Sequence, residues 1–273
     1  MLLVGTGGGV GCGGDAEGAA LGAADDASRV YFEAFSSFES SAQGATNPLI
    51  RFEDPRGTVY SLTAAHLGVD AIHLKLPTTS SCDTIDYRSP EFSQGLECQG
   101  EYLSLRGPFR VDLDTRKQGG NRRFWRIPSL DYRRVDVDLA PVSSPTSPLS
   151  TLEARASFEA DNAIRELAVD FRFHLTLSAV INAPLLTEES LIIGLDVADW
   201  LVRIPVTDCL RGGFLKAPHA QVDLDASLDA PTHSYFMYST PLQNCADAQD
   251  RFRSNLINSL RARIDAPGLG GSE

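Results

Sequence analysis

The sequence lacks any apolar stretch near the roughly 20 residues that a membrane-spanning helix needs. Basic residues are also few, since 24 Lys and Arg against 36 Asp and Glu give a formal net charge of -12. This negative charge repels phosphate backbones and anionic lipid surfaces. We therefore expect no nucleic-acid partner, and contact with a membrane through a lipid anchor only. Basic protein surfaces and other cations suit the charge better.

Catalytic sequence motifs are absent as well. The chain contains no Gly-x-Ser-x-Gly, His-Glu-x-x-His or Ser-x-x-Lys, and its five histidines form neither His-x-His nor His-x-x-x-His. Residues 9–14 match the dinucleotide pattern Gly-x-Gly-x-x-Gly, but no strand precedes them and no amphipathic helix follows. The sequence assigns no catalytic residue and no cofactor. A Ser-His-Asp triad needs no local motif, so a secreted hydrolase using His174 or His233 is kept as an alternative.

Cysteine is scarce, and its five positions are informative. Cys12 lies in a glycine-rich leader, whereas the other four are flanked by polar or turn-forming residues. No Cys-x-x-Cys spacing suggests zinc, so we expect two disulfides. Three connectivities are possible, and short loops favour Cys82–Cys98 and Cys209–Cys245. The alternative is a set of unpaired thiols in a cytosolic protein.

The clearest pattern is the alternation of residues 167–178. Leu, Val, Phe, Phe, Leu and Leu occupy one parity, while mostly polar residues occupy the other. Successive strand side chains point to opposite faces, so this pattern predicts one long strand with one face in a core. We expect the rest of the fold to be arranged around it.

Other segments repeat this alternation. Residues 58–76 predict a strand pair or one long bent strand, with a bulge where the parity changes at Asp70-Ala71. Strand patterns recur at 102–113, 127–139, 191–197 and around 222–224, and 30–38 suits a strand or a short helix. We predict a mainly β fold, an antiparallel β-sandwich, as one domain over 29–273 with a Ser/Pro loop at 141–150.

The two ends of the chain differ from this body. Residues 1–28 are rich in Gly, Ala and Asp and predict a disordered tether. Near the other end, Phe252, Leu256, Leu260 and Ile264 follow helical spacing, which predicts one amphipathic helix over about 246–264. We expect this helix to pack on the sandwich rather than to lie on a membrane surface.

The segment Gly9-Val10-Gly11-Cys12 resembles the end of a bacterial lipoprotein signal, in which a small residue precedes a lipidated Cys. Residues 60–65, 107–113 and 127–137 resemble, in this order, pieces of a group of uncharacterised bacterial secreted lipoproteins. The most suggestive piece is Pro-x-x-x-Tyr-Arg-Arg-Val-Asp at 128–136. The resemblance implies a prealbumin-like β-sandwich behind a lipid-anchored tether, attached through Cys12 in the bacterial cell envelope, on the outer membrane or the cell surface. It implies no catalytic residue.

Three Asp-x-Asp pairs suggest a possible metal site. In a strand, two such carboxylates lie on one face, about 6.5–7 Å apart. If two of these strands are neighbours, four carboxylates converge and suit Ca²⁺, which prefers oxygen ligands. The alternative is a solvated outer face of a sheet. The candidate ligands are Asp112, Asp114, Asp136 and Asp138, with Asp223 and Asp225 as the third pair.

Aromatic residues at 235–238 offer a candidate contact surface. Tyr235, Phe236 and Tyr238 could stack on a sugar or peptide, although core packing is the commoner use of such residues. Together these features favour a non-enzymatic binding or structural module of the cell envelope with an unknown surface ligand or protein partner. A secreted hydrolase and a calcium-stabilised adhesion-type domain are the alternatives.

Overall fold

The structure is a computed structural model that describes residues 27–37, 50–113, 124–142, 149–160, 163–206, 234–237 and 248–265. Several predicted features lie outside these residues. They are most of the leader with Cys12, the proposed pair Cys209 and Cys245, Asp114, Asp223, Asp225, Tyr238, His233 and most of the loop at 141–150. The described residues confirm a mainly β fold with sheets packed as in a β-sandwich.

The described part contains a nine-stranded and a four-stranded sheet. The large sheet is formed by β2 (Arg51–Glu53), β3 (Val59–Lys75), β4 (Leu96–Gln99), β5 (Tyr102–Asp112), β7 (Arg134–Leu139), β8 (Leu152–Ala160), β9 (Ala163–Phe171), β10 (Leu175–Val180) and β12 (Ser234–Met237). The small sheet is formed by β1 (Ala27–Phe35), β6 (Trp125–Pro128), β11 (Ser190–Asp196) and β13 (Leu260–Asp265). Most neighbours are antiparallel, but β1 pairs with β11 and β12 with β9 in parallel.

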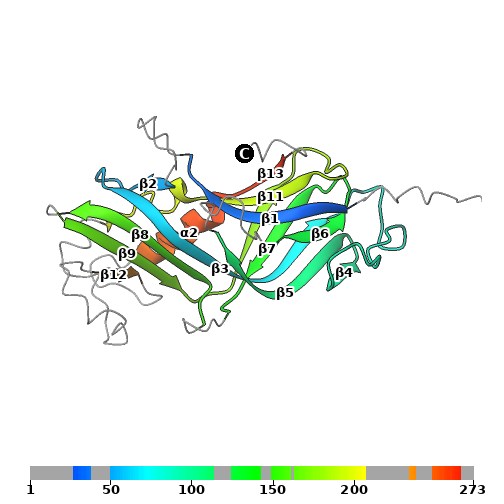
Figure 1. The fold of residues 1–273 in the computed structure, drawn as a ribbon, viewed down its shortest axis with the longest axis horizontal. Coiled ribbons are helices and arrows are strands. Elements are labelled where there is room, and N and C mark those ends of the chain that lie inside the picture. Colours follow the sequence, from blue (N-terminus) through cyan, green and yellow to red (C-terminus); the bar gives the residue numbers. More distant parts are fainter. Residues whose placement is uncertain are drawn as a thin grey trace, which may run out of the picture.

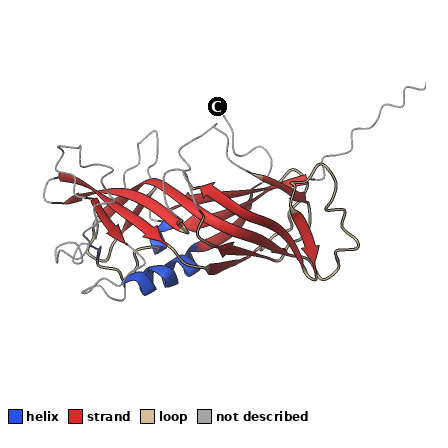
Figure 2. Ribbon diagram, turned by 90° about the horizontal axis from the view of Figure 1, so that it is seen from below, coloured by secondary structure: helices blue, strands red, loops and turns tan. Residues whose placement is uncertain are grey.

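The large sheet is covered on its apolar face by two different elements (Figures 1 and 2). The small sheet covers one half, where Phe109 of β5 meets Trp125 of β6 at a ring-centroid distance of 5.0 Å. The helix α2 (Ala248–Ser259) covers the other half, where Phe252 stacks on Phe171 of β9 at 4.6 Å. One continuous cluster of buried side chains runs beneath both, so the two halves share a core.

The strand β3 joins these halves. Its first part pairs with β2 and β8, and its second part lies between β5 and β7. The register with β5 and β7 shifts between Val69 and Ala71. This confirms the long bent strand and the bulge predicted at residues 70–71. The element around which the fold is arranged is therefore β3.

The single long strand predicted over 167–178 is wrong in one respect. The alternation persists, but the chain forms β9 and β10 with residues 172–174 between them. In that gap the Thr151 hydroxyl donates to Phe173 O at 2.6 Å and accepts from Phe173 N at 3.0 Å. The Thr151 side chain thus supplies the hydrogen bonds that a neighbouring strand would otherwise make to Phe173. Across the gap, the chain changes its pairing partner from β8 to β7, and alternate residues keep facing the same side of the sheet.

The predicted C-terminal helix is too long. The helix α2 ends at Ser259, and residues 260–265 form β13, which pairs with β11. Phe252 and Leu256 are buried, so α2 packs on the core as expected. Leu260 and Ile264 are four positions apart, a spacing that places residues on one face of a helix and equally on one face of a strand. Among the described residues, no helix is long and apolar enough to cross a membrane.

Candidate functional site

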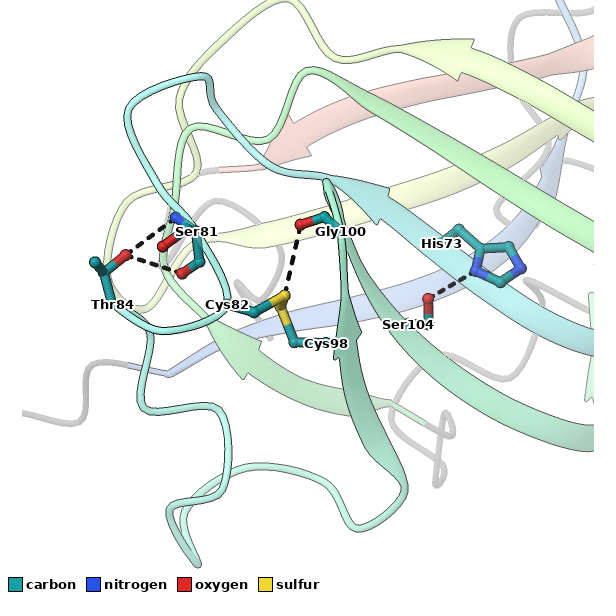
Figure 3. The surroundings of a disulfide bond; sticks show 7 residues. All are labelled: His73, Ser81, Cys82, Thr84, Cys98, Gly100 and Ser104. Atoms are coloured by element: carbon teal, nitrogen blue, oxygen red, sulfur yellow. Dashed lines mark hydrogen bonds between the residues drawn. A yellow bond between two sulfur atoms is a disulfide. The ribbon is translucent and has the colours of Figure 1, made fainter.

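A polar row crosses the outer face of the large sheet on three adjacent strands. His73 of β3 shares a hydrogen bond of 2.7 Å between its Nδ1 and the Ser104 hydroxyl of β5 (Figure 3). Its Nε2 lies 3.0 Å from Oδ2 of Asp138 on β7. The structure thus brings a Ser, a His and an Asp into line at His73, whereas the histidines predicted for such a role were His174 and His233.

The surroundings of this row do not suit nucleophilic catalysis. Ser104 is only 8% exposed and lies within β5, which is paired with β4 and β3 on its two sides. The backbone N–H groups of paired strands bond to neighbouring strands and cannot form an oxyanion hole. The backbone oxygen of His174 accepts from Arg253 at 3.5 Å, and no described Ser or Asp contacts the imidazole of His174. The hydrolase alternative gains no support here.

The two aspartates of β7 are engaged by protein donors. Asp136 accepts from the Ser178 hydroxyl at 2.6 Å and from Arg134 Nε at 3.0 Å. The hydrogen bond to Asp136 raises the pKa of Arg134. Asp138 accepts from the Thr176 hydroxyl at 2.6 Å as well as contacting His73. Asp136 is only 8% exposed, although its face of the sheet was expected to be solvated. The hydrogen bonds from Ser178 and Arg134 take the place of water around its carboxylate.

The described carboxylates of the calcium hypothesis do not converge. The strand β3 lies between β5 and β7, so the strands of Asp112 and Asp136 are not neighbours. Asp112 lies opposite His66 and Asp136 opposite His73, seven positions further along β3. Within the described ranges, no group of three or more His, Cys, Asp and Glu side chains could hold a metal ion. Calcium binding stays a prediction, and Asp114 lies outside those ranges.

The disulfide prediction is confirmed for its first pair. Cys82 and Cys98 are joined across the polar connection between β3 and β5, near the polar row (Figure 3). Cys82 and Cys98 are 16 positions apart, and closing a loop of about this length stabilises the folded state by roughly 3 kcal/mol.

An open groove of about 500 Å³ lies at one end of the large sheet. This volume is within the usual range of ligand sites, about 300–1,000 Å³. We call it the end groove. It crosses β2, β3, β8 and β9, and its lining is formed by Arg51, Gly57, Thr58, Val59, Ser61, Ser157, Phe158, Glu159 and Ile164.

One wall of the end groove is built by a fixed turn. Asp54 is 3% exposed, and its Oδ1 accepts from the backbone N–H of Arg56 at 2.9 Å and of Thr58 at 3.1 Å. Gly57 completes the turn with φ +84°, a backbone conformation that glycine adopts at little cost. The wall is thus held in place by the protein's own hydrogen bonds before any ligand binds.

The end groove exposes apolar side chains on a face that is otherwise polar. Val59 is 40% and Ile164 is 70% exposed. Neither residue was predicted from the sequence as part of a site. The available signal is that Ile164 occupies the parity of Glu166 and Asp170, opposite to the buried Leu167 and Val169. Val59 and Ile164 line the same groove because β8 lies between their strands, pairing with β3 on one side and with β9 on the other.

A second space lies inside the core, but it is too small to act as a site. It measures about 10 Å³, room for about one water molecule. Its lining includes Trp200, Phe252 and the small side chains Ala154 and Ala156. The end groove is therefore the better candidate among the described residues.

The aromatic segment at 235–238 is only partly described. Residues 234–237 form β12, which pairs in parallel with residues 166–169 of β9. Tyr235 lies opposite Leu167 and Phe236 opposite Ala168. A role of Tyr235, Phe236 and Tyr238 in ligand stacking stays a prediction.

No protein-family model, curated protein or solved structure matches this chain. The resemblance to secreted bacterial lipoproteins therefore stays a prediction.

One hydrogen bond gives a structural role to the tyrosine of the Pro-x-x-x-Tyr motif. In Pro-x-x-x-Tyr, the Tyr132 hydroxyl donates to Pro128 O at 2.9 Å. A tyrosine bonded to the backbone a few residues upstream is a known device of β-sandwiches.

Proposed function

We propose that this protein is a non-enzymatic binding module of the bacterial cell envelope, anchored by lipid at Cys12, and that the end groove is its contact surface. The observation that carries the proposal is a preformed groove that exposes Val59 and Ile164 on an otherwise polar face. Exposed apolar side chains gathered in a groove mark interaction sites more often than scattered ones do. The Cys82–Cys98 disulfide suits an oxidising compartment.

Site-specific photocrosslinking in living cells tests the contact surface. A photoreactive benzoylphenylalanine replaces Ile164 in the end groove, or Val180 as a control. Val180 is 63% exposed, close to the 70% of Ile164, but it lies on β10 outside the groove. Similar exposure makes random collisions comparable at the two positions.

We expect irradiation to give a discrete crosslinked product from position 164 and not from position 180. The product should weaken when Val59→Asp is added, because a charge then replaces an apolar contact. Equal patterns from both positions, or no product from position 164, would contradict the assignment of the end groove.

A further inference from the structure

Two arginines and two aromatic residues form a cluster on the outer face of the small sheet. We call it the arginine–aromatic patch, and its members are Arg29, Tyr31, Phe124 and Arg126. We propose that it binds an acidic saccharide, whose carboxylate lies at the two arginines and whose ring lies against Phe124. This second site is on a different sheet from the end groove and is independent of the function proposed for that groove.

The two arginines face each other across neighbouring strands. The strands β1 and β6 lie side by side in the small sheet (Figure 1), and Arg29 is directly opposite Arg126. The next pair, Val30 and Trp125, is buried, so both arginines point to the outer face. Like charges directly opposite each other destabilise a sheet. A carboxylate held by both guanidinium groups would remove this repulsion, and arginine binds carboxylates through paired hydrogen bonds.

The backbone brings these two side chains close together. Arg126 N donates to the Ser93 hydroxyl at 2.8 Å, and Arg126 O accepts from Ser93 N at 2.9 Å. Arg29 N donates to Glu189 O at 3.1 Å. The backbone groups of both arginines therefore bond away from each other, which makes them a non-hydrogen-bonded pair. In such pairs the Cα atoms are about 4.5 Å apart and the side chains are closest.

No acidic residue faces Arg29 across either described neighbouring strand. Its neighbour on the side away from Arg126 is Ser190 of β11. Arg29 is exposed and makes no ion pair with the described residues. On the same face, by contrast, Arg263 binds Glu33 at 2.8 Å. An anionic ligand thus reaches Arg29 without displacing a described carboxylate.

Phe124 orients the Arg29 guanidinium and offers a surface for a sugar ring. The guanidinium carbon of Arg29 lies 5.4 Å from the centre of the Phe124 ring. Tyr31 packs on the same ring at a centroid distance of 5.7 Å. Phe124 is still 44% exposed. A guanidinium stacked on a ring can still donate from its edge, and an exposed aromatic ring can contact the apolar face of a sugar.

The charge of the sequence around the arginine–aromatic patch opposes the net charge of the chain. Residues 115–130 contain five Lys or Arg and no Asp or Glu, whereas the whole chain carries -12. The net charge repels long polyanions, but a short acidic ligand interacts mainly with the charges near its own site. The Cys82–Cys98 disulfide suits a compartment outside the cytosol, where an acidic glycan is more accessible than a nucleic acid.

Isothermal titration calorimetry with the full chain tests the proposal. The probes are tetragalacturonate and a hyaluronan tetrasaccharide, and their methyl esters are matched neutral controls. Arg29→Gln and Arg126→Gln each remove one charge of the pair, and Phe124→Leu removes the aromatic ring. Arg88→Gln is the control variant, because Arg88 is also exposed and lies 5.2 Å from the centre of the Tyr87 ring, outside the patch.

We expect at least one acidic tetrasaccharide to bind, and its methyl ester to bind about tenfold more weakly. Arg29→Gln and Arg126→Gln should each weaken binding by about tenfold, because a charge-assisted hydrogen-bonded contact is lost. Phe124→Leu should weaken it by about threefold. Arg88→Gln should leave the affinity unchanged. Equal losses in Arg29→Gln and Arg88→Gln, equal binding of acid and ester, or no binding of either acid would overturn the proposal.

Two further probes separate a saccharide from other anions. Oligothymidine and vesicles of phosphatidylcholine and phosphatidylglycerol in equal parts present phosphates on different carriers. If one of them binds and loses affinity in Arg29→Gln while neither acidic saccharide binds, the ligand is a nucleic acid or a lipid surface and the saccharide proposal is wrong. Crosslinking at position 164 reports on the end groove alone, so the two sites can fail separately.

Discussion

At the scale of single residues, Tyr132 links the two sheets through one hydrogen bond. Pro128 ends β6 of the small sheet, and Tyr132 lies just before β7 of the large sheet. The Tyr132 side chain is fully buried, and its hydroxyl donates to Pro128 O. Burial raises the pKa of Tyr132 well above its ordinary value of 10.0, because the phenolate has no water around it.

This environment predicts a specific loss of stability in alkali. Above pH 10 the unfolded chain releases the Tyr132 proton while the folded chain keeps it, so stability falls as the pH rises through and above that value. Each pH unit costs up to about 1.4 kcal/mol from this residue. Tyr132→Phe should be less stable by about 1 kcal/mol at pH 7, because Pro128 O loses its donor.

Urea unfolding at pH 7 and pH 11 measures both effects. The difference between Tyr132→Phe and the unaltered protein should shrink at the higher pH, with Tyr87→Phe as a half-buried control. Parallel loss of stability in the unaltered protein and Tyr132→Phe would show that Tyr132 does not carry the effect.

At the scale of elements, β3 makes the two halves of the molecule dependent on each other. Its first part pairs with β8, in the half of the large sheet that α2 covers. Its second part pairs with β7, in the half that the small sheet covers. A strand cannot keep one half of its ladder while the other half unfolds without exposing buried backbone groups. We therefore expect the described halves to unfold in one cooperative transition.

Two core variants test this expectation. Val137→Ala removes a buried side chain from β7, and Phe252→Ala removes the side chain that α2 stacks on Phe171. Each should lower stability by about 1–5 kcal/mol and shift the same calorimetric transition. Ile257→Ala, on the exposed side of α2, should change it little. Two separate transitions, each shifted by one variant only, would contradict the shared role of β3.

The same elements show how far the sequence predicts the structure. Local patterns identified the bulge near Asp70 and the pairing of Cys82 with Cys98, because parity changes and short loops are visible in the sequence. The spacing of Leu260 and Ile264 fits a helix and a strand equally, so it could not locate the end of α2. The end groove was not predictable either, because only long-range strand pairing brings Val59 and Ile164 to the same groove.

At the scale of the whole molecule, anchoring predicts a specific covalent form. If Cys12 is the lipidated residue, intact mass spectrometry of protein from its native cells should show a chain beginning at Cys12 with acyl mass added. The four other cysteines should react with an alkylating agent only after reduction. For Cys82 and Cys98 this follows from the disulfide that joins them. A full-length, unlipidated chain with five reactive thiols would contradict both the anchor and the oxidising compartment.

The parallel pairing of β1 with β11 has a consequence for biosynthesis. Val30 pairs with Leu191, about 160 positions later in the chain, so β1 has no β11 partner while most of the large sheet is being made. At about 5–20 residues per second, a ribosome needs roughly 8–30 s to cover this distance. During that interval the apolar face of β1, with Val30 and Phe32, needs temporary shielding. A nascent-chain chaperone that holds extended apolar segments would meet this need.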